Sequence, residues 1–332
     1  MNGEKYIELH AHLDGSITLD IAKKLAAMQG ISLAGDDELI DIISVPPTCD
    51  SLTEFLKCFD FPLSLMQTRE SISEAVKLVL DDMAAVGVVY AEIRFAPQLH
   101  TAKGLTQEEV IIAAIDGLND YLLNKSDMKA NLILCCMRGS DNENANIETV
   151  KLAGRYLSKG VVALDLAGAE ALYPTSGYTR LFEQAAELGI PYTIHAGEAA
   201  GADSVYTAID MGAVRIGHGI RAITDDKLVK LIRDKGICLE MCPTSNRITK
   251  AVDDMSRYPL REYIDRGIKV TINTDDLAIV RTDISKEFEY AKQLADLTEQ
   301  EVYQLKYNAA EASFADDAAK KWIKARLERD ND

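Results

Sequence analysis

Eight short apolar runs recur along the chain, and longer stretches with helical spacing of apolar residues separate them. The runs cover residues 6–10, 88–95, 131–137, 161–166, 192–195, 214–218, 237–241 and 269–273. Continuous apolar runs of this length are typical of strands that are buried on both faces of a parallel sheet. Two of the clearest helical patterns between them span residues 106–123 and 178–188.

The alternation of eight strands with helices predicts an α/β fold, a (β/α)₈ TIM barrel. A doubly wound open sheet is the alternative, but it would normally carry a glycine-rich phosphate loop after an early strand, and the sequence shows none. No Pro/Gly/Ser-rich linker divides the chain, so we expect one domain over residues 1–332.

The segment 14–82 is longer than one crossover needs, and it predicts a helical insertion after the first strand. Its helical patterns cover residues 19–29, 36–43, 51–60 and 70–83. In a barrel, such an insertion would lie over the end where the strands finish. A lid and a merely decorative addition are both compatible with this pattern.

Four of the five histidines stand at the ends of predicted strands. They are His10, His12, His195 and His218, and the fifth is His100. Strand alternation places His10 and His12 on one side, and neutral imidazole is a common zinc ligand. A single histidine of this kind is more simply a hydrogen-bonded strand cap, but four at one end of a barrel indicate a metal site. We expect His100 to lie at the surface or in a loop, and Arg94 to be a structural residue of the barrel, with a role in the site as the alternative.

Carboxylates accompany these histidines. Asp275 and Asp276 follow the last strand, and a buried pair implies a cation or a shared proton, whereas an exposed pair would be a turn or helix cap. As a fourth ligand, Asp275 would leave a position open for water, and Asp276 would face a substrate. Glu198 follows His195 by three residues and could reach that water or be an ordinary residue of a first helical turn.

The charge of the chain narrows the choice of partner. Acidic residues number 53 against 36 basic ones, giving a net charge of -17. Such a chain repels nucleic acids and anionic membranes, which favours a neutral small molecule. No apolar run approaches the roughly 20 residues of a membrane span, and the first strand motif starts so early that we expect no signal peptide. The six cysteines form no C-x-x-C pair, so we expect a cytoplasmic protein with reduced cysteines.

In combination, these motifs resemble those of the adenosine deaminase family over nearly the whole chain. The matching stretches are ELHAHLDGS (8–16), DLAG (165–168), HAGE (195–198), RIGHG (215–219), CPTSN (242–246) and NTDD (273–276). Each stretch is short, but their order at successive strand ends makes the combination specific. The resemblance implies hydrolytic, zinc-dependent conversion of adenosine, and of 2′-deoxyadenosine, to inosine and ammonia.

The resemblance also implies roles for individual residues. One Zn²⁺ per chain would be held by His10, His12, His195 and Asp275. Glu198 would move protons at the purine ring, and His218 would orient the attacking water. The residues in contact with the nucleoside would be His12, Asp14 at the ribose, Gly168 and Asp276 at the purine.

One position departs from the family pattern, and one segment can be interpreted in two ways. Leu277 stands where many members carry proline after the paired aspartates. Leu52, Phe55, Leu56 and Phe59 look like the family's apolar gate, although their i, i+3, i+4, i+7 spacing equally suits a helix that faces the core.

Alternative functions predict different residues. A related deaminase specific for adenine tends to carry glutamate at the position of Asp14 and to lack the LAG stretch 166–168. A deaminase acting on a modified AMP would need basic residues near the mouth of the barrel. A two-metal hydrolase would often carry a carboxylated lysine at a strand end, where this chain has Met137-Arg138 and Asp165-Leu166. A non-catalytic nucleoside-binding protein would have lost a ligand or the proton carrier. Cytidine-deaminase motifs (H-x-E, P-C-x-x-C) are absent.

Overall fold

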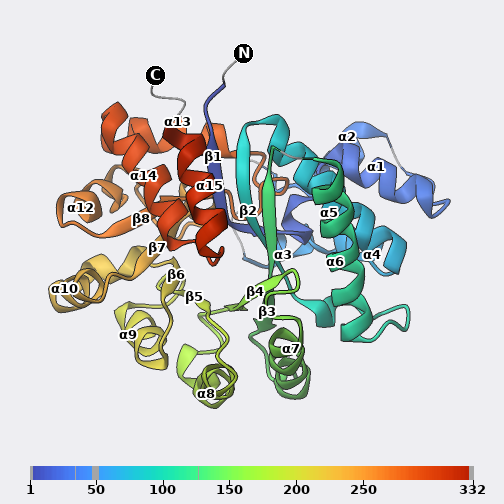
Figure 1. Ribbon diagram of the computed structural model, residues 1–332, viewed down its shortest axis with the longest axis horizontal. Helices are drawn as coiled ribbons and strands as arrows, with labels where there is room; N and C mark the ends of the chain where they lie inside the picture. The colour runs from blue at the N-terminus through green and yellow to red at the C-terminus, as the bar shows by residue number, and fades with distance from the viewer. Residues whose placement is uncertain (1–2, 34, 47–51, 126, 329–332) are drawn as a thin grey trace.

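The computed structural model describes residues 3–33, 35–46, 52–125 and 127–328. Its strands are β1 (Tyr6–His12), β2 (Val88–Phe95), β3 (Lys129–Met137), β4 (Val161–Ala167), β5 (Thr193–Ala196), β6 (Arg215–His218), β7 (Cys238–Met241) and β8 (Lys269–Ile272). Consecutive strands pair in parallel within β1–β4 and within β5–β8. The predicted (β/α)₈ barrel is confirmed, each strand within two residues of its expected bounds, and the open-sheet alternative is wrong (Figure 1).

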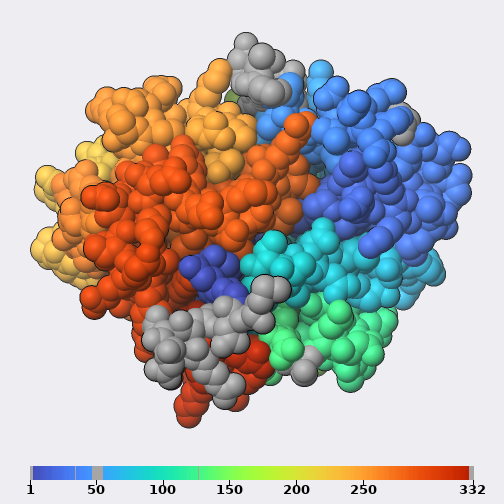
Figure 2. Space-filling view, turned by 90° about the horizontal axis from the view of Figure 1, so that it is seen from above, coloured from blue at the N-terminus to red at the C-terminus, as the bar shows by residue number. Residues whose placement is uncertain are grey.

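The two four-stranded halves meet at two seams. At one seam, the N–H of His12 donates to the carbonyl of Asp275 (2.9 Å), and the N–H of Asp275 donates to the carbonyl of His10 (2.8 Å). At the other, the N–H of Leu164 donates to the carbonyl of Pro191 (3.0 Å). In Figure 2, the dark-blue start of the chain lies at the surface between the orange-red C-terminal region and a cyan region of the chain.

Helices cover the outside of the barrel. Those after β2 are α6 (Gln107–Asn124), α7 (Glu143–Tyr156), α8 (Thr179–Glu187), α9 (Ala202–Met211), α10 (Asp226–Lys235), α11 (Pro243–Ile248), α12 (Leu260–Asp265), α13 (Ile284–Ala295), α14 (Glu299–Ala312) and α15 (Asp317–Glu328). Helix α6 begins at a capping box between Thr106 and Glu109, which satisfies the first backbone N–H groups. None of the helices in the described ranges is both long and apolar enough to cross a membrane.

The insertion between β1 and β2 is helical, as predicted. It contains α1 (Leu19–Met28), α2 (Asp36–Ile43), α3 (Leu52–Lys57), α4 (Asp60–Leu65) and α5 (Arg69–Ala85), drawn in blue to cyan in Figure 1. The single helix expected over residues 51–60 is wrong, because the chain turns after α3 and starts α4. Pro62 gives the reason: a proline lacks the N–H that a continuing helix needs and is tolerated only in a first turn, where it lies in α4.

The barrel interior is charged, while apolar residues fill the space between strands and helices. Arg94 on β2 pairs with Glu240 on β7 (2.8 Å), and Arg215 on β6 pairs with Glu92 on β2 (2.6 Å) and with Glu240 (2.6 Å). Since isolated buried charges are strongly disfavoured, this mutual pairing is what allows the interior to be ionic. Arg94 is therefore buried structure, as expected.

His100 departs from its expected exposure. It ends the 3₁₀ helix η2 (Pro97–His100) and is buried, with Nδ1 2.8 Å from the carbonyl oxygen of Met66 and the ring against Phe95. Burial lowers the pKa of His100 to about 4, so the ring is neutral and donates to that carbonyl. The sequence could not show this, because the carbonyl partner belongs to a segment 34 residues away.

Candidate active site

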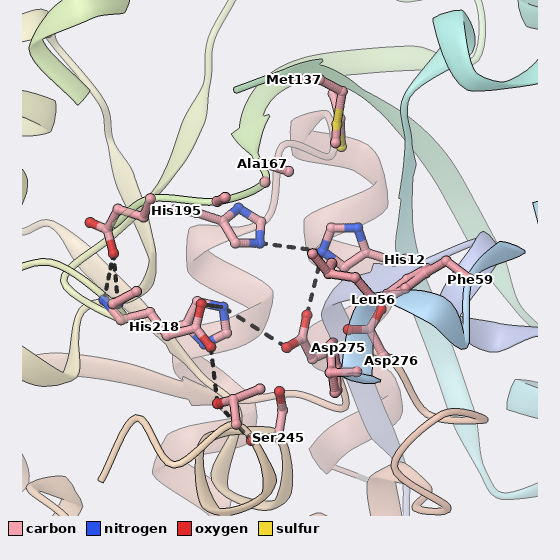
Figure 3. Close-up of a pocket in the computed structure, with 18 of the residues that line it drawn as sticks. His12, Leu56, Phe59, Met137, Ala167, His195, His218, Ser245, Asp275 and Asp276 are labelled. Atoms are coloured by element: carbon pink, nitrogen blue, oxygen red, sulfur yellow. Dashed lines mark hydrogen bonds and ion pairs between the residues drawn. The ribbon is translucent and has the colours of Figure 1, made fainter. Parts of the chain in front are cut away.

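A cavity of about 500 Å³ opens where the strands end, a size suited to a small ligand. All the residues predicted for the site line it except His10, which lies beneath its floor. They are His12, Asp14, Gly168, His195, Glu198, His218, Asp275 and Asp276. Figure 3 shows the labelled histidines and aspartates around one centre.

Three imidazoles and one carboxylate converge in this cavity. His195 Nε2 lies 3.0 Å from His10 Nε2 and 3.3 Å from His12 Nε2. Asp275 Oδ1 lies 3.2 Å from His10 Nε2 and 3.4 Å from His12 Nε2. The edge of a tetrahedron around an ion with ligands at about 2.0–2.1 Å is about 3.3–3.4 Å. These four ligand–ligand distances, 3.0–3.4 Å, are close to that edge length, as expected for atoms that share one metal ion.

The partners of the Nδ1 atoms indicate which ring nitrogens can bind a metal ion. His10 Nδ1 lies 2.7 Å from Glu240 Oε2, and His195 Nδ1 lies 2.9 Å from Asp165 Oδ2. Burial alone would raise the pKa of Glu240, but Arg215 and Arg94 lower it well below its usual range, so it is ionised and can only accept. Burial and Arg94 lower the pKa of His10, but Asp275 and Glu240 outweigh them and raise it to about 8. In the neutral form that a metal ligand requires, each of the two rings carries its proton on Nδ1. Two facing Nε2 lone pairs repel each other unless a cation lies between them, and the donor set therefore fits a metal ion.

Asp275 is held in place by the seam of the barrel. Its backbone has a φ of +63°, a left-handed conformation that costs a non-glycine residue about 1–3 kcal/mol. The two hydrogen bonds with His10 and His12 offset this cost and fix the residue against β1. Asp275 stands three residues after the end of β8, so its carboxylate meets His10 and His12, which are more than 260 residues away in the chain.

His218 ends β6 and presents a donor to the cavity. Its Nδ1 lies 3.0 Å from the side-chain amide of Asn246, whose oxygen accepts from the Tyr258 hydroxyl (3.0 Å). In this orientation Nδ1 accepts, so the proton of the neutral ring is on Nε2. Nε2 lies 3.5 Å from Glu198 Oε2 and 3.9 Å from Asp275 Oδ2. His218 lies with His10, His195 and Asp275 in one group of side chains close enough to hold a metal ion, but its Nε2–H suits it to hydrogen bonding rather than to ligation.

Glu198 lies in the loop between β5 and α9. Burial raises the pKa of its carboxyl; the nearby His218 opposes this, while Asp275 and Glu170 add to it. Thr249 Oγ1 lies 3.4 Å from Glu198 Oε1. A glutamate with a raised pKa, placed at the wall of a cavity, can hold a proton and give it to a ligand.

Asp276 and Asp14 add two further carboxyls. Asp276 is buried, and its Oδ1 has no hydrogen-bond partner among the described residues. Burial, then Asp275 and Asp14, raise the pKa of Asp276 well above its usual range, and burial raises that of Asp14 to about 6. A Cβ on Gly15 would lie 2.0 Å from Asp276 Oδ1, so only glycine leaves room for this carboxyl. A buried acceptor without a partner is a natural contact for a bound ligand.

Several residues in or around the site were not predicted from sequence to take part in it. Asn246 belongs to the CPTSN motif, but its contact with His218 spans 28 residues and has no local signal. Arg221 and Lys250 line the mouth, where the sequence pattern placed no basic cluster. The Arg221 guanidinium donates to the carbonyls of Glu198 (2.7 Å) and Ala251 (3.4 Å), and Lys250 is exposed. Leu277 packs against the apolar core.

Comparison with known proteins agrees with this geometry. The sequence profile of the family described as Adenosine deaminase matches residues 6–329. The chain belongs to the adenosine deaminase family. A protein named Adenosine deaminase from Haemophilus ducreyi is 47% identical to it, over 97% of this chain and 95% of that protein.

Solved structures of adenosine deaminase relatives have the same fold. An adenine deaminase from Arthrobacter aurescens has a TM-score of 0.86 and 27% identity, covering 98% of this chain and 99% of that one. An Arabidopsis N6-mAMP deaminase has a TM-score of 0.85 and 27% identity, covering 99% and 98%. These names span a base and a nucleotide, so the fold alone leaves the substrate of this adenosine deaminase family member to be argued from its own site.

Proposed function

We propose that this protein hydrolyses adenosine, and 2′-deoxyadenosine, to inosine and ammonia with one zinc ion per chain. The observation that carries the proposal is the convergence of His10, His12, His195 and Asp275 beside Glu198, in a cavity of suitable size. The high identity to a protein named Adenosine deaminase supports the nucleoside as substrate.

The donor set suits zinc. Three imidazole nitrogens and one carboxylate oxygen form a common zinc environment, and Glu240 and Asp165 orient two of the rings from behind. When bound, the zinc ion would supply the Lewis acidity that makes a water molecule a nucleophile near neutral pH.

The protein's own groups would then handle the protons. The neutral carboxyl of Glu198 donates its proton to the ring nitrogen next to the attacked carbon, which lets the ring accept electrons as it loses aromaticity. His218 Nε2–H hydrogen-bonds the attacking water and orients it toward the ring. The attacking water supplies the remaining two protons. One restores the carboxyl of Glu198, and the other joins the amino group, which leaves as ammonia while the ring carbon keeps the water oxygen as a carbonyl.

Substrate contacts follow from the same wall. The neutral carboxyl of Asp276 carries an O–H that can donate to an unprotonated purine nitrogen. The backbone of Gly168, after β4, would contact another edge of the purine, and Asp14 would bind a ribose hydroxyl. His12 lines the cavity beside Asp14 and would touch the substrate as well as the metal.

Helices α3 and α4 would act as a lid, within a chain that functions as a single domain. Phe55, Leu56 and Phe59 line the cavity, and Leu56 is 48% exposed at its mouth. Phe55 also packs against Ile279 and Val280, so it serves as core and as wall. The side chain of Leu52 lies outside the described residues. Covering the mouth would exclude bulk water and strengthen the interactions within.

An ultraviolet assay with adenosine, adenine and AMP, with and without a chelator, tests the proposal. We expect the specificity constant for adenosine to exceed those for adenine and AMP by at least about tenfold, and the chelator to abolish turnover. Faster turnover of AMP would assign Arg221 and Lys250 to a phosphate and favour a nucleotide deaminase. Binding of adenosine without any turnover would instead identify a nucleoside-binding protein.

Asp14→Ala tests the preference for a nucleoside. Losing a charged hydrogen bond to the ribose should cost roughly 1.5–3 kcal/mol, which is about tenfold to a hundredfold in kcat/KM for adenosine. Zinc content should stay near that of the parent. Asp20→Ala, at an exposed carboxylate of α1, is the matched control and should change nothing. Unchanged adenosine kinetics in Asp14→Ala would leave Asp14 as a loop residue only.

A further inference from the structure

Glu170 is a buried carboxylate with an unusual set of partners. It lies in the loop after β4, two residues beyond Gly168, and is 4% exposed. Its Oε1 accepts from the N–H of Gly197 (2.7 Å), and its Oε2 accepts from the N–H groups of Glu198 (3.1 Å), Ala199 (2.7 Å) and Ala200 (2.9 Å). One side chain therefore binds four consecutive backbone N–H groups of the loop that carries Glu198.

A hydroxyl completes the coordination of this carboxylate. Ser204, in the first turn of α9, donates to Glu170 Oε1 (2.5 Å), and its oxygen lies 2.7 Å from Thr175 Oγ1. Burial alone would raise the pKa of Glu170, but the hydrogen bonds from Ser204 and the backbone lower it, so the group is ionised. Although Glu170 lines the cavity, both oxygens are occupied by donors of the protein, and it is not a substrate contact.

The conformation of the loop depends on such an anchor. Gly197 has a φ of +74°, and the next four residues form no helix or strand. The carbonyl of Glu198 accepts from Arg221 Nε (2.7 Å) while its N–H donates to Glu170. The main chain of Glu198 is thus held at both ends of the residue, and its carboxyl is left facing His218 and Thr249.

We propose that Glu170 is a positioning residue for the reaction: it binds the N–H groups of residues 197–200 and so fixes the carboxyl of Glu198 where it can give its proton to the substrate. The inference rests on the proposed role of Glu198 as proton donor. Geometry of this kind is sensitive, because a displacement of about 1 Å at a reacting group can cost roughly a hundredfold in rate. The negative charge of Glu170 also disfavours ionisation of Glu198, which acts in the same direction.

Glu170→Gln is the variant to test. The amide keeps the shape, but it has one acceptor oxygen, and its NH₂ must face an N–H or a hydroxyl that the carboxylate bound. We expect kcat for adenosine to fall roughly 10- to 100-fold, while zinc content and the Kd of a non-reactive purine riboside change less than about threefold. Glu183→Gln, an exposed residue of α8, is the control for the lost charge and should match the parent.

The decisive measurement repeats Glu170→Gln in a Glu198→Gln background. If Glu170 acts through Glu198, the second substitution should lower kcat by less than about twofold further, since the group that it positions is already disabled. If the two substitutions instead lower kcat by the product of their separate effects, Glu170 acts independently of Glu198 and the proposal is overturned. A loss of zinc and riboside binding in Glu170→Gln alone would show a general structural role and would also overturn it. An unchanged kcat in Glu170→Gln would also overturn it.

Ser204→Ala keeps the test open if Glu170→Gln does not fold. It removes one donor to Glu170 and leaves the four N–H contacts, so kcat should fall only a few-fold, and again not in the Glu198→Gln background. The inference would be contradicted if Ser204→Ala lowered kcat by the same factor in the Glu198→Gln background as in the parent. Failure of the proposed function looks different: Glu198→Gln itself would then retain the turnover of the parent.

Discussion

Glu198→Gln should lower the turnover of adenosine by roughly a hundredfold or more, the usual scale for general acid–base catalysis. Glutamine has nearly the same shape and can donate a hydrogen bond, but it cannot pass a proton to the ring. The Glu198 carboxyl lies against His218 and Thr249, and neither is a proposed metal ligand, so the variant should fold and keep its zinc. Turnover, zinc content and binding of a non-reactive purine riboside are the three measurements.

The outcome separates two roles for Glu198. Near-normal turnover would refute proton donation, and loss of zinc or of folding would instead support a structural role near the start of α9. Glu187→Gln, at an exposed residue of α8, serves as the control for a carboxylate-to-amide change and should behave like the parent.

Asp275→Ala should remove the metal and with it the activity. The parent should carry about one zinc per chain, and the variant should lose most of it on dialysis against a chelator, because three neutral imidazoles remain without their anionic partner. Turnover should fall at least about a hundredfold, since even substitutions behind the ligands typically cost 10- to 100-fold. Elemental analysis and the adenosine assay provide the readouts.

Asp276→Ala is the matched control for Asp275→Ala. It removes the neighbouring carboxyl, which lies against Gly15, and should retain zinc while it weakens turnover through the substrate. Equal loss of zinc in both variants would contradict the assignment of Asp275 as the ligand. A metal-free parent that still deaminates adenosine would contradict the metal centre altogether.

The barrel could be predicted from sequence because its strands are buried on both faces. Most of these strands are short, mainly apolar runs interrupted by one or two charged residues that pair inside the barrel, and β2 was placed at its observed bounds, Val88–Phe95. Local patterns of this kind depend on neighbours in the chain. The break between α3 and α4 was missed because the apolar spacing continues through it, whereas Pro62 lies in the first turn of a new helix that begins at Asp60.

The site was predictable where its residues stand at strand ends. Parallel strands finish at one edge, so His10, His12, His195 and Asp275 had to meet once the barrel was assumed. Glu170 was not predictable in this way. Its partners begin 27 residues further along, and a lone glutamate in a loop carries no sign that four N–H groups will point at it.

The proposed metal site lies at the seam between β1 and Asp275, and its ligands come from both halves of the barrel. His10 and His12 belong to the half β1–β4, whereas His195 and Asp275 belong to the half β5–β8. An ion bound by all four residues would therefore cross-link the two halves, with two ligands from each. It would lie at the seam where the end of β1 is hydrogen-bonded to Asp275. Ion binding and closure of the barrel would then be thermodynamically linked. A substitution that destabilises the seam would lower the affinity for the ion, and loss of the ion would in turn destabilise the seam.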